Sequence, residues 1–374
     1  MEPRCFFLMP SAHPDSVALA ELVSEDERVS ARFQPAAAEA RFFTFEDHDD
    51  LQQCRLDLEQ ALQRIRREAN RREPMVVNPT SGTKQMSAAA TMAALDAEAD
   101  EIVFITGPRE NGVVITGEEQ IQKLDTSQFY AEQAAKEARR LLAAGAFHGA
   151  AEILKPWRDR QDPTIDQIQT LAQVLHEWQR LNYGTACQCA ARPEMASFTA
   201  LRRWLSGLRQ APELDPAILA DLLDACATLL HWNRVEEALA YLYRSTELAG
   251  KLALKEAYAL EPPYQEEDLA HLLPRRRERF RALARDGKLH LGLREIWEIL
   301  RLLKLPLAEA YFGHYAFRTL IEARNQTVFG HGTVPAEIEE VQGALQHLCQ
   351  ELDAQPWVMQ PACRRLQLVR GLHM

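Results

Sequence analysis

The sequence lacks the short patterns that mark the most common catalytic sites. It contains no CxxC pair, no HExxH pattern, no GxSxG turn, no GxGxxG loop and no GxxxxGK[ST] loop. Zinc catalysis therefore has no support in the sequence, and neither has a serine hydrolase, a dinucleotide-binding enzyme or a P-loop ATPase. No metal site and no cofactor are predicted. A catalytic site must be sought in less common patterns.

Cysteine and long apolar runs are also scarce. The seven cysteines are scattered, and Cys187-x-Cys189 has no His or Cys partners at zinc spacing. We therefore expect free thiols in a reducing compartment. No apolar run approaches the ~20 residues that span a bilayer, and the N-terminus lacks a basic region and a clean cleavage site. The sequence predicts a cytoplasmic protein with no membrane partner.

Acidic residues outnumber basic ones. The 54 acidic and 43 basic residues give a net charge of −11, which argues against a surface that binds nucleic acid everywhere. A nuclease is compatible with this charge if basic residues line a local groove. The length of 374 residues and the hydrophobic fraction of 47% predict a globular protein of two or three domains.

Residues 1–117 alternate strand-like and helix-like segments. The predicted strands are Cys5–Met9, Arg41–Phe45, Pro74–Val77, Ile102–Ile105 and Val113–Ile115, and the predicted helices are Asp49–Arg67 and Thr83–Leu95. The connection TGPRENG suits a hairpin between the last two strands. This alternation is typical of an α/β fold with a largely parallel sheet and helices on both faces.

From about Ser127 onward the spacing of apolar residues is helical. The predicted helices are Tyr130–Ala144, His148–Trp157, Ile218–His231, Val235–Tyr258, Leu291–Leu303, Ala308–Ala323 and Ala336–Asp353. Thr333 and Pro335 occupy cap positions of the last helix, and residues 261–288 are interpreted as an irregular insertion. We expect a domain of residues 1–128, a helical linker domain of residues 129–215 and a C-terminal domain of residues 216–374.

A polar loop, Asn78–Lys84, connects a predicted strand to the helix that follows it. Its sequence NPTSGTK supplies hydroxyl groups, a glycine and a cation at a helix N-terminus, where free N–H groups attract anions. Open α/β sheets also bind ligands at this end of their strands. A ligand-binding loop and an ordinary polar helix cap are about equally compatible with this segment taken alone.

A second polar segment, Arg324–Gly332, follows a predicted helix near the C-terminus. Arginine can hold a phosphate with its planar fork, and histidine can move protons near neutral pH. The two residues suffice for RNA cleavage in which a ribose 2′-hydroxyl attacks the adjacent phosphate. By spacing alone, a plain helix C-terminus with a surface histidine explains the segment better.

A basic cluster lies within the predicted insertion. It comprises Arg275, Arg276, Arg277, Arg279, Arg281, Arg285 and Lys288. The cluster could contact an RNA backbone, but Glu278 and Asp286 interrupt it. A solvated helix face is the favoured interpretation.

Three segments in this order resemble the type III CRISPR-associated accessory ribonucleases, which join an N-terminal CARF sensor to a C-terminal HEPN nuclease. Asp49–Leu51 with Asn78–Ala88 is similar to the sensor segment of that family, and Val235–Arg244 is similar to its signature helix. Arg324–Gly332 resembles the HEPN pattern of Arg, four to six residues and then His. The resemblance implies an α/β plus all-α fold, with a Rossmann-like CARF domain followed by a helical HEPN effector region.

The same resemblance implies a function. Cyclic oligoadenylate would be an allosteric activator that binds across a homodimer of sensor domains, and the effector would be a metal-independent endoribonuclease cutting single-stranded RNA. The ligand-binding residues would be Asn78, Thr80, Ser81, Gly82, Thr83 and Lys84. In the effector, Arg324 would stabilise phosphate charge, His331 would transfer a proton or contact the leaving group, and Asn325 would position them.

Two other functions remain open at this point. One is a cyclic-oligoadenylate-binding sensor whose HEPN domain is weak or inactive, although the presence of both Arg324 and His331 argues against decay. The other is a ring nuclease that degrades the oligoadenylate itself through Thr80, Ser81 and Lys84.

The first strand of the sensor fold has no clear counterpart in the sequence. Counting back from the polar loop, Pro74–Val77 corresponds to the fourth strand, Arg41–Phe45 to the third and Cys5–Met9 to the second. The first strand, which is central in a doubly wound sheet, would then be missing. In the alternative, Cys5–Met9 is the first strand and Ser11–Asp15 its loop, which leaves only about six residues for a later parallel crossover that needs a dozen or more.

Overall fold

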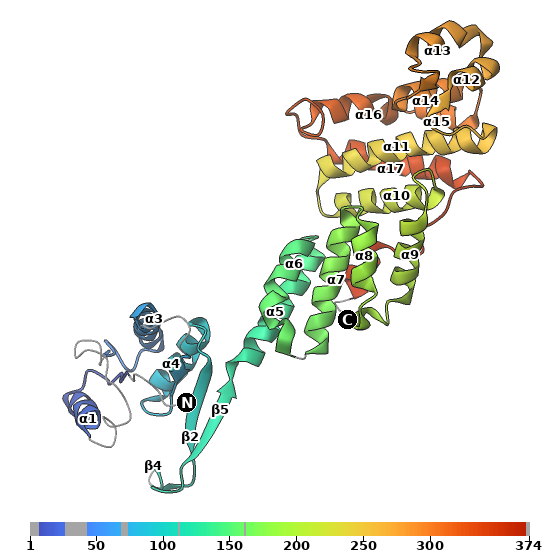
Figure 1. Cartoon of the computed structure of the whole chain (residues 1–374). Helices are drawn as coiled ribbons and strands as arrows, with labels where there is room; N and C mark the ends of the chain where they lie inside the picture. The colour runs from blue at the N-terminus through green and yellow to red at the C-terminus, as the bar shows by residue number, and fades with distance from the viewer. Residues whose placement is uncertain (1–6, 27–42, 69–73, 111–112, 161, 372–374) are drawn as a thin grey trace. The chain divides into compact units, whose positions relative to one another are not determined.

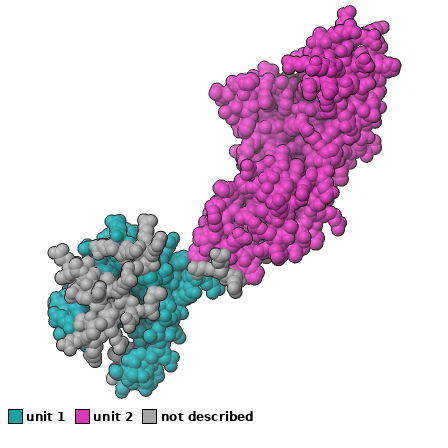
Figure 2. All heavy atoms as spheres, viewed as in Figure 1, with its two compact units in different colours: residues 1–133 teal, residues 134–374 magenta. Residues whose placement is uncertain are grey.

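The computed structural model describes residues 7–26, 43–68, 74–110, 113–160 and 162–371. The chain forms two compact units, residues 1–133 and 134–374 (Figure 2). The first is mixed α/β and the second is almost entirely helical, so the predicted fold class is confirmed (Figure 1). The predicted boundaries at 128/129 and 215/216 stay predictions.

The first unit is built around a small sheet of mixed direction. Its elements are α1 (Pro14–Glu25), α3 (Leu51–Glu68), β1 (Val76–Val77), α4 (Lys84–Asp96), β2 (Glu101–Thr106), β3 (Arg109–Glu110), β4 (Val113–Val114), β5 (Gln120–Asp125) and the start of α5 (Thr126–Ala143). The strand order is β1-β2-β5, with β1 parallel and β5 antiparallel to β2. Cys54, Ala89, Ala93 and Ile102 are fully buried where α3, α4 and β2 meet.

Two sequence predictions for this sheet are wrong. The partner of β2 is β5, in the register Ile102↔Leu124, and not the segment Val113–Ile115. That segment pairs instead with Arg109–Glu110, as β4 with β3. Because β5 is antiparallel to β2, the described sheet is also not largely parallel. The strand β5 escaped prediction because its sequence QIQKLD is fully exposed and has no buried face.

The first two predicted strands fall partly on residues 1–6 and 27–42, outside the described residues. In the described part, the Phe43 N–H donates to the Leu8 carbonyl at 3.1 Å, and Ser11 forms a parallel bridge with Phe45. The second and third strands are neighbours in a doubly wound sheet. The pairing therefore fits the interpretation in which Cys5–Met9 is the second strand, and the missing first strand stays a prediction.

The second unit is a stack of helical hairpins. Its first elements are the rest of α5, α6 (Phe147–Leu154), η2 (Lys155–Arg160), α7 (Pro163–Gln179), α8 (Tyr183–Ala190), η3 (Pro193–Met195) and α9 (Thr199–Gln210). The later ones are α10 (Pro216–His231), α11 (Val235–Tyr258), β6 (Tyr264–Gln265), α12 (Glu266–Leu272), η4 (Pro274–Arg276), α13 (Arg277–Leu283), β7 (Lys288–Leu289), α14 (Leu293–Leu302), α15 (Pro306–Gly313), α16 (Tyr315–Gln326), α17 (Ile338–Asp353) and α18 (Arg365–Gly371).

The long helix α11 is the centre of this unit and packs against α10, α14, α16 and α17. Gly250 allows α14 to approach closely, because a Cβ at this position would lie 2.7 Å from a methyl carbon of Ile296. Buried side chains such as Trp297 and Leu252 fill the space between the helices. The helix α11 therefore supports the helix that carries Arg324.

Three predictions in this unit need correction. The predicted helix Ala308–Ala323 is two helices, α15 and α16, with a break at His314. The predicted irregular insertion contains α12, η4, α13 and the small hairpin β6–β7, whose helices are too short for apolar periodicity to reveal. The last long helix begins after Glu337 rather than at the predicted cap residues.

Candidate functional site

The segment Arg324–Gly332 forms a compact structure at the end of α16. Arg324 and Asn325 lie in the last turn of the helix, and the following loop turns back onto it (Figure 1). The His331 N–H donates to the Asn325 carbonyl at 2.9 Å, and the hydroxyl of buried Thr327 donates to the Arg324 carbonyl at 2.8 Å. These bonds satisfy carbonyls that a helix end leaves without partners. They bring His331 to the helix turn that carries Arg324 and Asn325.

Two glycines make this close return possible. A Cβ at Gly330 would lie 2.5 Å from the Arg324 carbonyl oxygen, and a Cβ at Gly332 would collide with the backbone of Gln326. Any larger residue would push the loop away from the helix end. The Gly-His-Gly sequence is therefore required by the backbone path that positions His331.

Arg324 is held from the side by α11. Its guanidinium carbon lies 5.3 Å from the centroid of the Tyr243 ring, and its Nη1 donates to the Asn325 side-chain oxygen at 3.1 Å. Burial raises the pKa of the Tyr243 hydroxyl, Glu247 raises it further, and Arg324 opposes the shift. The cation is attracted to the face of the ring, which limits the rotamers of the arginine.

The outer side of the loop is open. Asn325 and His331 are exposed, while Arg324 is half-buried. Val328 and Phe329 are 74% and 46% exposed, which is unusual for side chains of this type in a folded domain. The end of α16 and its loop therefore combine a half-buried cation with an exposed imidazole and exposed apolar side chains.

The Asn78–Lys84 loop follows β1 and leads into α4, as predicted. Thr83 caps α4, because its hydroxyl accepts the Met86 N–H at 3.2 Å and donates to the His48 carbonyl at 3.0 Å. The Thr80 hydroxyl accepts the Ile105 N–H of β2 at 2.8 Å. Both threonines thus join the loop to its surroundings.

Other residues of the loop face outward. Asn78 accepts the Thr80 N–H at 3.0 Å and stabilises the turn, and Gly82 has a φ of +125°, a conformation that favours glycine. Ser81 and Lys84 are exposed at the N-terminus of α4. The loop therefore combines supporting threonines with an accessible hydroxyl and a cation, an arrangement that suits an anionic ligand.

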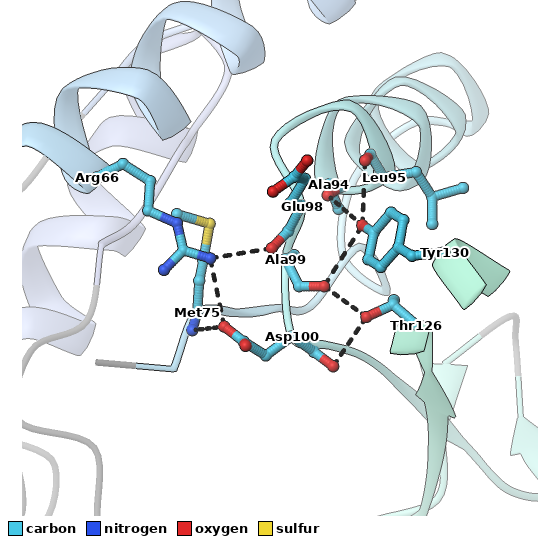
Figure 3. Close-up of polar contacts among 9 residues, drawn as sticks. All are labelled: Arg66, Met75, Ala94, Leu95, Glu98, Ala99, Asp100, Thr126 and Tyr130. Atoms are coloured by element: carbon cyan, nitrogen blue, oxygen red, sulfur yellow. Dashed lines mark hydrogen bonds and ion pairs between the residues drawn. The ribbon is translucent and has the colours of Figure 1, made fainter. Parts of the chain in front are cut away.

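The other end of α4 carries a polar cluster that sequence analysis missed (Figure 3). Tyr130 donates its hydroxyl to the Leu95 carbonyl at 3.0 Å, and Thr126 donates to the Ala99 and Asp100 carbonyls. The Asp100 carboxylate accepts the Met75 N–H at 2.7 Å. The first turn of α5 is thereby fixed to the end of the helix that starts at the polar loop.

The residues that were not predicted from the sequence were missed for one common reason. Tyr243, Thr126 and Tyr130 act through tertiary contacts, and nothing in their local sequence distinguishes them from other helical residues. Tyr243 does lie within the segment Val235–Arg244 that suggested a signature helix. Thr327 lies inside the predicted motif, and a hydroxyl at the end of a helix was the available signal.

The described residues contain neither a metal-ligand group nor a membrane-spanning helix. Among them, no group of three or more His, Cys, Asp and Glu side chains could hold a metal ion. Nor does any helix in that part of the chain combine the length and apolar character needed to cross a membrane. The six cysteines in the described ranges are free thiols, as predicted.

Comparisons with known proteins agree with the geometry. Residues 209–355 match the family model of the Csm6 HEPN domain. This part of the chain therefore carries a HEPN domain similar to that of Csm6. The fold of the chain is similar to that of Enterococcus italicus Csm6 bound to cyclic hexa-2′-fluoro-hexa-dAMP, with a TM-score of 0.66 and 12% sequence identity, over 99% of this chain and 92% of the other. The search of curated proteins gave no match.

The residues that match the HEPN family model include the Arg324–Gly332 segment. Residues 209–355 run from the end of α9 through α17 and include both Tyr243 and the Arg324–Gly332 segment. The structural match also includes the first unit with the Asn78–Lys84 loop, since it covers 99% of the chain. The resemblance inferred from the sequence is therefore confirmed at the level of family and fold.

Proposed function

We propose that this CARF–HEPN protein is a metal-independent endoribonuclease that cuts single-stranded RNA at Arg324, Asn325 and His331. The observation that supports this most directly is the return of the loop onto the end of α16, which brings His331 to the turn carrying Arg324. A cationic fork and a proton-transferring imidazole at one accessible surface are the groups that phosphodiester transfer requires.

In the proposed reaction the ribose 2′-oxygen attacks the adjacent phosphorus. The bond from phosphorus to the 5′-oxygen breaks, leaving a 2′,3′-cyclic phosphate on one product and a 5′-hydroxyl on the other. A solvent water accepts the proton that the attacking 2′-hydroxyl loses. Arg324 stabilises the negative charge that grows on the phosphoryl oxygens, and His331 donates a proton to the departing 5′-oxygen. Asn325 orients the arginine through the hydrogen bond between their side chains.

The active form in this proposal is a homodimer with a composite groove. Val328 and Phe329 are exposed beside the candidate catalytic residues, and a second copy of the chain would cover such side chains. A two-fold axis near the loop would place both copies of Arg324 and His331 on one RNA strand. Residues 216–374 would form the nuclease domain, 129–215 the linker domain and 1–128 the sensor domain.

The proposed allosteric activator is a cyclic oligoadenylate bound at the Asn78–Lys84 loop. The structurally similar Enterococcus italicus protein was solved with a cyclic hexanucleotide analogue. Lys84, the Ser81 hydroxyl and the N–H groups at the start of α4 would contact its phosphates, while Asn78, Thr80, Gly82 and Thr83 maintain the loop. Binding would favour the active arrangement of the effector, a coupling between two separate sites. We place the protein in the cytoplasm, with no membrane partner.

Cleavage of a fluorescent single-stranded RNA in EDTA tests this function. The wild-type protein is expected to cut the RNA when cyclic tetra-adenylate or cyclic hexa-adenylate is added, and mass spectrometry is expected to find 2′,3′-cyclic phosphate ends. Cleavage that requires added Mg²⁺ or Mn²⁺ would contradict metal independence. If the cyclic oligoadenylate becomes linear while the RNA stays intact, the protein is a ring nuclease instead.

A further inference from the structure

The basic cluster lies on a well-formed lobe of the second unit, which we call the insertion lobe (residues 264–289). The short strands β6 and β7 close it in the register Tyr264↔Leu289, and α12, η4 and α13 lie between them. Tyr264, Leu289 and Phe280 are buried and anchor the lobe to the core of the unit. The lobe is thus a fixed platform rather than the irregular insertion expected from sequence.

The platform carries a concentration of positive charge. All seven basic side chains are exposed: Arg275, Arg276, Arg277, Arg279, Arg281, Arg285 and Lys288. Over residues 264–289 they stand against five acidic residues (Glu266, Glu267, Asp268, Glu278 and Asp286), which gives the lobe a net charge of +2, whereas the whole chain carries −11. The acidic residues 266–268 precede the basic run, and only Glu278 and Asp286 interrupt it. The lobe therefore differs in sign from the net charge of the whole chain.

Most of these cations have no carboxylate partner among the described residues. Arg279 pairs with Glu298 at 3.2 Å, and Arg281 pairs with Glu266 at 3.6 Å. Within the described ranges no ion pair is formed by the other five, which are Arg275, Arg276, Arg277, Arg285 and Lys288. An ordinary solvated face mixes charges of both signs, so a surface with five unpaired cations indicates an anionic partner.

We infer that the insertion lobe is a docking surface for the phosphate backbone of single-stranded RNA, separate from the cutting residues. Arginine forks bind phosphate oxygens in pairs, and a backbone offers one charge per nucleotide. An acidic protein partner is less favoured, because protein interfaces need an apolar centre. Among the described residues, the exposed large apolar side chains at the basic run are Leu283, which is 48% exposed, and the neighbouring Leu302 of α14, which is 39% exposed.

The inference rests on the proposed function, because it assigns the lobe to the same RNA substrate. Figure 1 shows α12 and α13 at one end of the layer that contains α14, α15 and α16, and the Arg324–His331 loop at the other end. Both lie in one compact unit. A strand held on the lobe would raise the local RNA concentration at the cutting residues, by the electrostatic attraction that governs most RNA association.

The test is RNA binding by fluorescence anisotropy at several salt concentrations. A long fluorescent RNA is mixed in EDTA with His331→Ala protein, and with the same protein carrying Arg275→Glu, Arg276→Glu and Arg277→Glu. The lobe variant is expected to bind at least tenfold more weakly. Its plot of log affinity against log salt should be flatter by about two, since each lost phosphate contact removes about 0.7 from the slope for a single strand.

A charge-matched control separates the lobe from net charge. Arg202, Arg203 and Arg209 are exposed on α9, and replacing all three with Glu changes the charge by the same amount. This control should keep the salt slope of the parent. If the lobe variant is poorly folded by circular dichroism, the corresponding Arg→Gln set replaces it, with the same expectation for the slope.

Two failures can be told apart. If the lobe variant and the α9 control bind RNA equally, the docking inference is wrong whatever the protein cuts. If the wild-type protein cuts no RNA under any activator, the proposed function fails first. A gel of the RNA recovered from each titration confirms that binding was measured on intact strands.

Discussion

Single residues of the Arg324–Gly332 segment have separable roles in the account. Gly330 and Gly332 permit the backbone path, and Thr327 closes the helix end from inside. His331 is exposed, whereas Arg324 is half-buried beside the Tyr243 ring. The positions of those side chains depend on residues that have no chemistry of their own.

Replacing Gly332 with Ala is expected to lower RNA cleavage without unfolding the protein. The new methyl group would meet the Gln326 backbone and displace the loop, and a displacement of about 1 Å at a catalytic group can cost about 100-fold in rate. Single-turnover cleavage measures the effect. Gly343→Ala in α17 is the control, because a Cβ there meets nothing within 4 Å and should stabilise the helix by up to about 1 kcal/mol.

The outcome that would contradict this role is equal cleavage by Gly332→Ala and wild-type protein. Circular dichroism melting of both variants shows whether any loss of rate follows from loss of fold.

Substitutions in the Asn78–Lys84 loop should also distinguish residues that contact the ligand from residues that support the fold. Lys84→Ala is expected to weaken binding of cyclic hexa-adenylate on the order of tenfold, because a charge-assisted contact to phosphate is lost, while the melting temperature stays the same. Thr80→Val should instead destabilise the first unit by about 1–3 kcal/mol, because the Ile105 N–H loses its acceptor. Isothermal titration calorimetry and thermal melting measure the two effects.

Lys123→Ala, an exposed lysine of β5 that pairs with Glu101, is the control for charge. Unchanged affinity in Lys84→Ala would remove this lysine from the ligand site.

At the level of elements, a buried ion-pair network joins α18 to the helices before it. Arg365 is 1% exposed and contacts Asp221 at 3.0 Å and Asp224 at 2.9 Å, with Trp178 lying 4.1 Å below the guanidinium. Asp221 also accepts the Trp178 indole N–H at 2.8 Å and the Tyr183 hydroxyl at 2.9 Å. The network connects α7, α8, α10 and α18 within the helical unit.

Arg365→Met is expected to destabilise the protein by about 3–5 kcal/mol, because it leaves two buried carboxylates without their cation. Urea unfolding followed by tryptophan fluorescence measures the change. Arg364→Met is the neighbouring control, since Arg364 is exposed and bonds only to Gln360 among the described residues. Equal midpoints for the two variants would show that the carboxylates are not held charged by Arg365.

Elements with strong local signals were predictable from sequence. The helices α10 and α11 were predicted within two residues of their observed bounds, because their apolar spacing is regular. The strand β5 and the break at His314 were not, since one has no buried face and the other follows from tertiary packing. Short helices such as α12 and α13 give too few turns for a periodic pattern.

The candidate site was predictable as a set of residues but not as a geometry. Resemblance to the HEPN pattern predicted Arg324, Asn325 and His331, whereas spacing alone favoured a plain helix end. The hydrogen bond between His331 and Asn325 and the contact with Tyr243 required the fold. In the Asn78–Lys84 loop, the sequence alone did not distinguish the hydroxyl groups of Thr80, Ser81 and Thr83. The fold separates Thr80 and Thr83, which support the loop, from Ser81 and Lys84, which are accessible.

At the scale of the whole molecule, the proposed function combines sensing of an anionic activator and cutting of RNA in one chain. The two candidate sites lie in different compact units, Asn78–Lys84 in the first and Arg324–Gly332 in the second. The sensing and cutting sites would be coupled by a difference in affinity between two states of the protein. The claim on which the rest depends is that Arg324 and His331 perform the cut.

The most direct test is the single-turnover rate of RNA cleavage in EDTA with saturating cyclic oligoadenylate. Wild-type protein should cut single-stranded RNA, and Arg324→Ala and His331→Ala should each be slower by about 100-fold or more, with unchanged melting temperatures. If either variant cuts as fast as the wild type, the cutting residues lie elsewhere and the central claim is wrong.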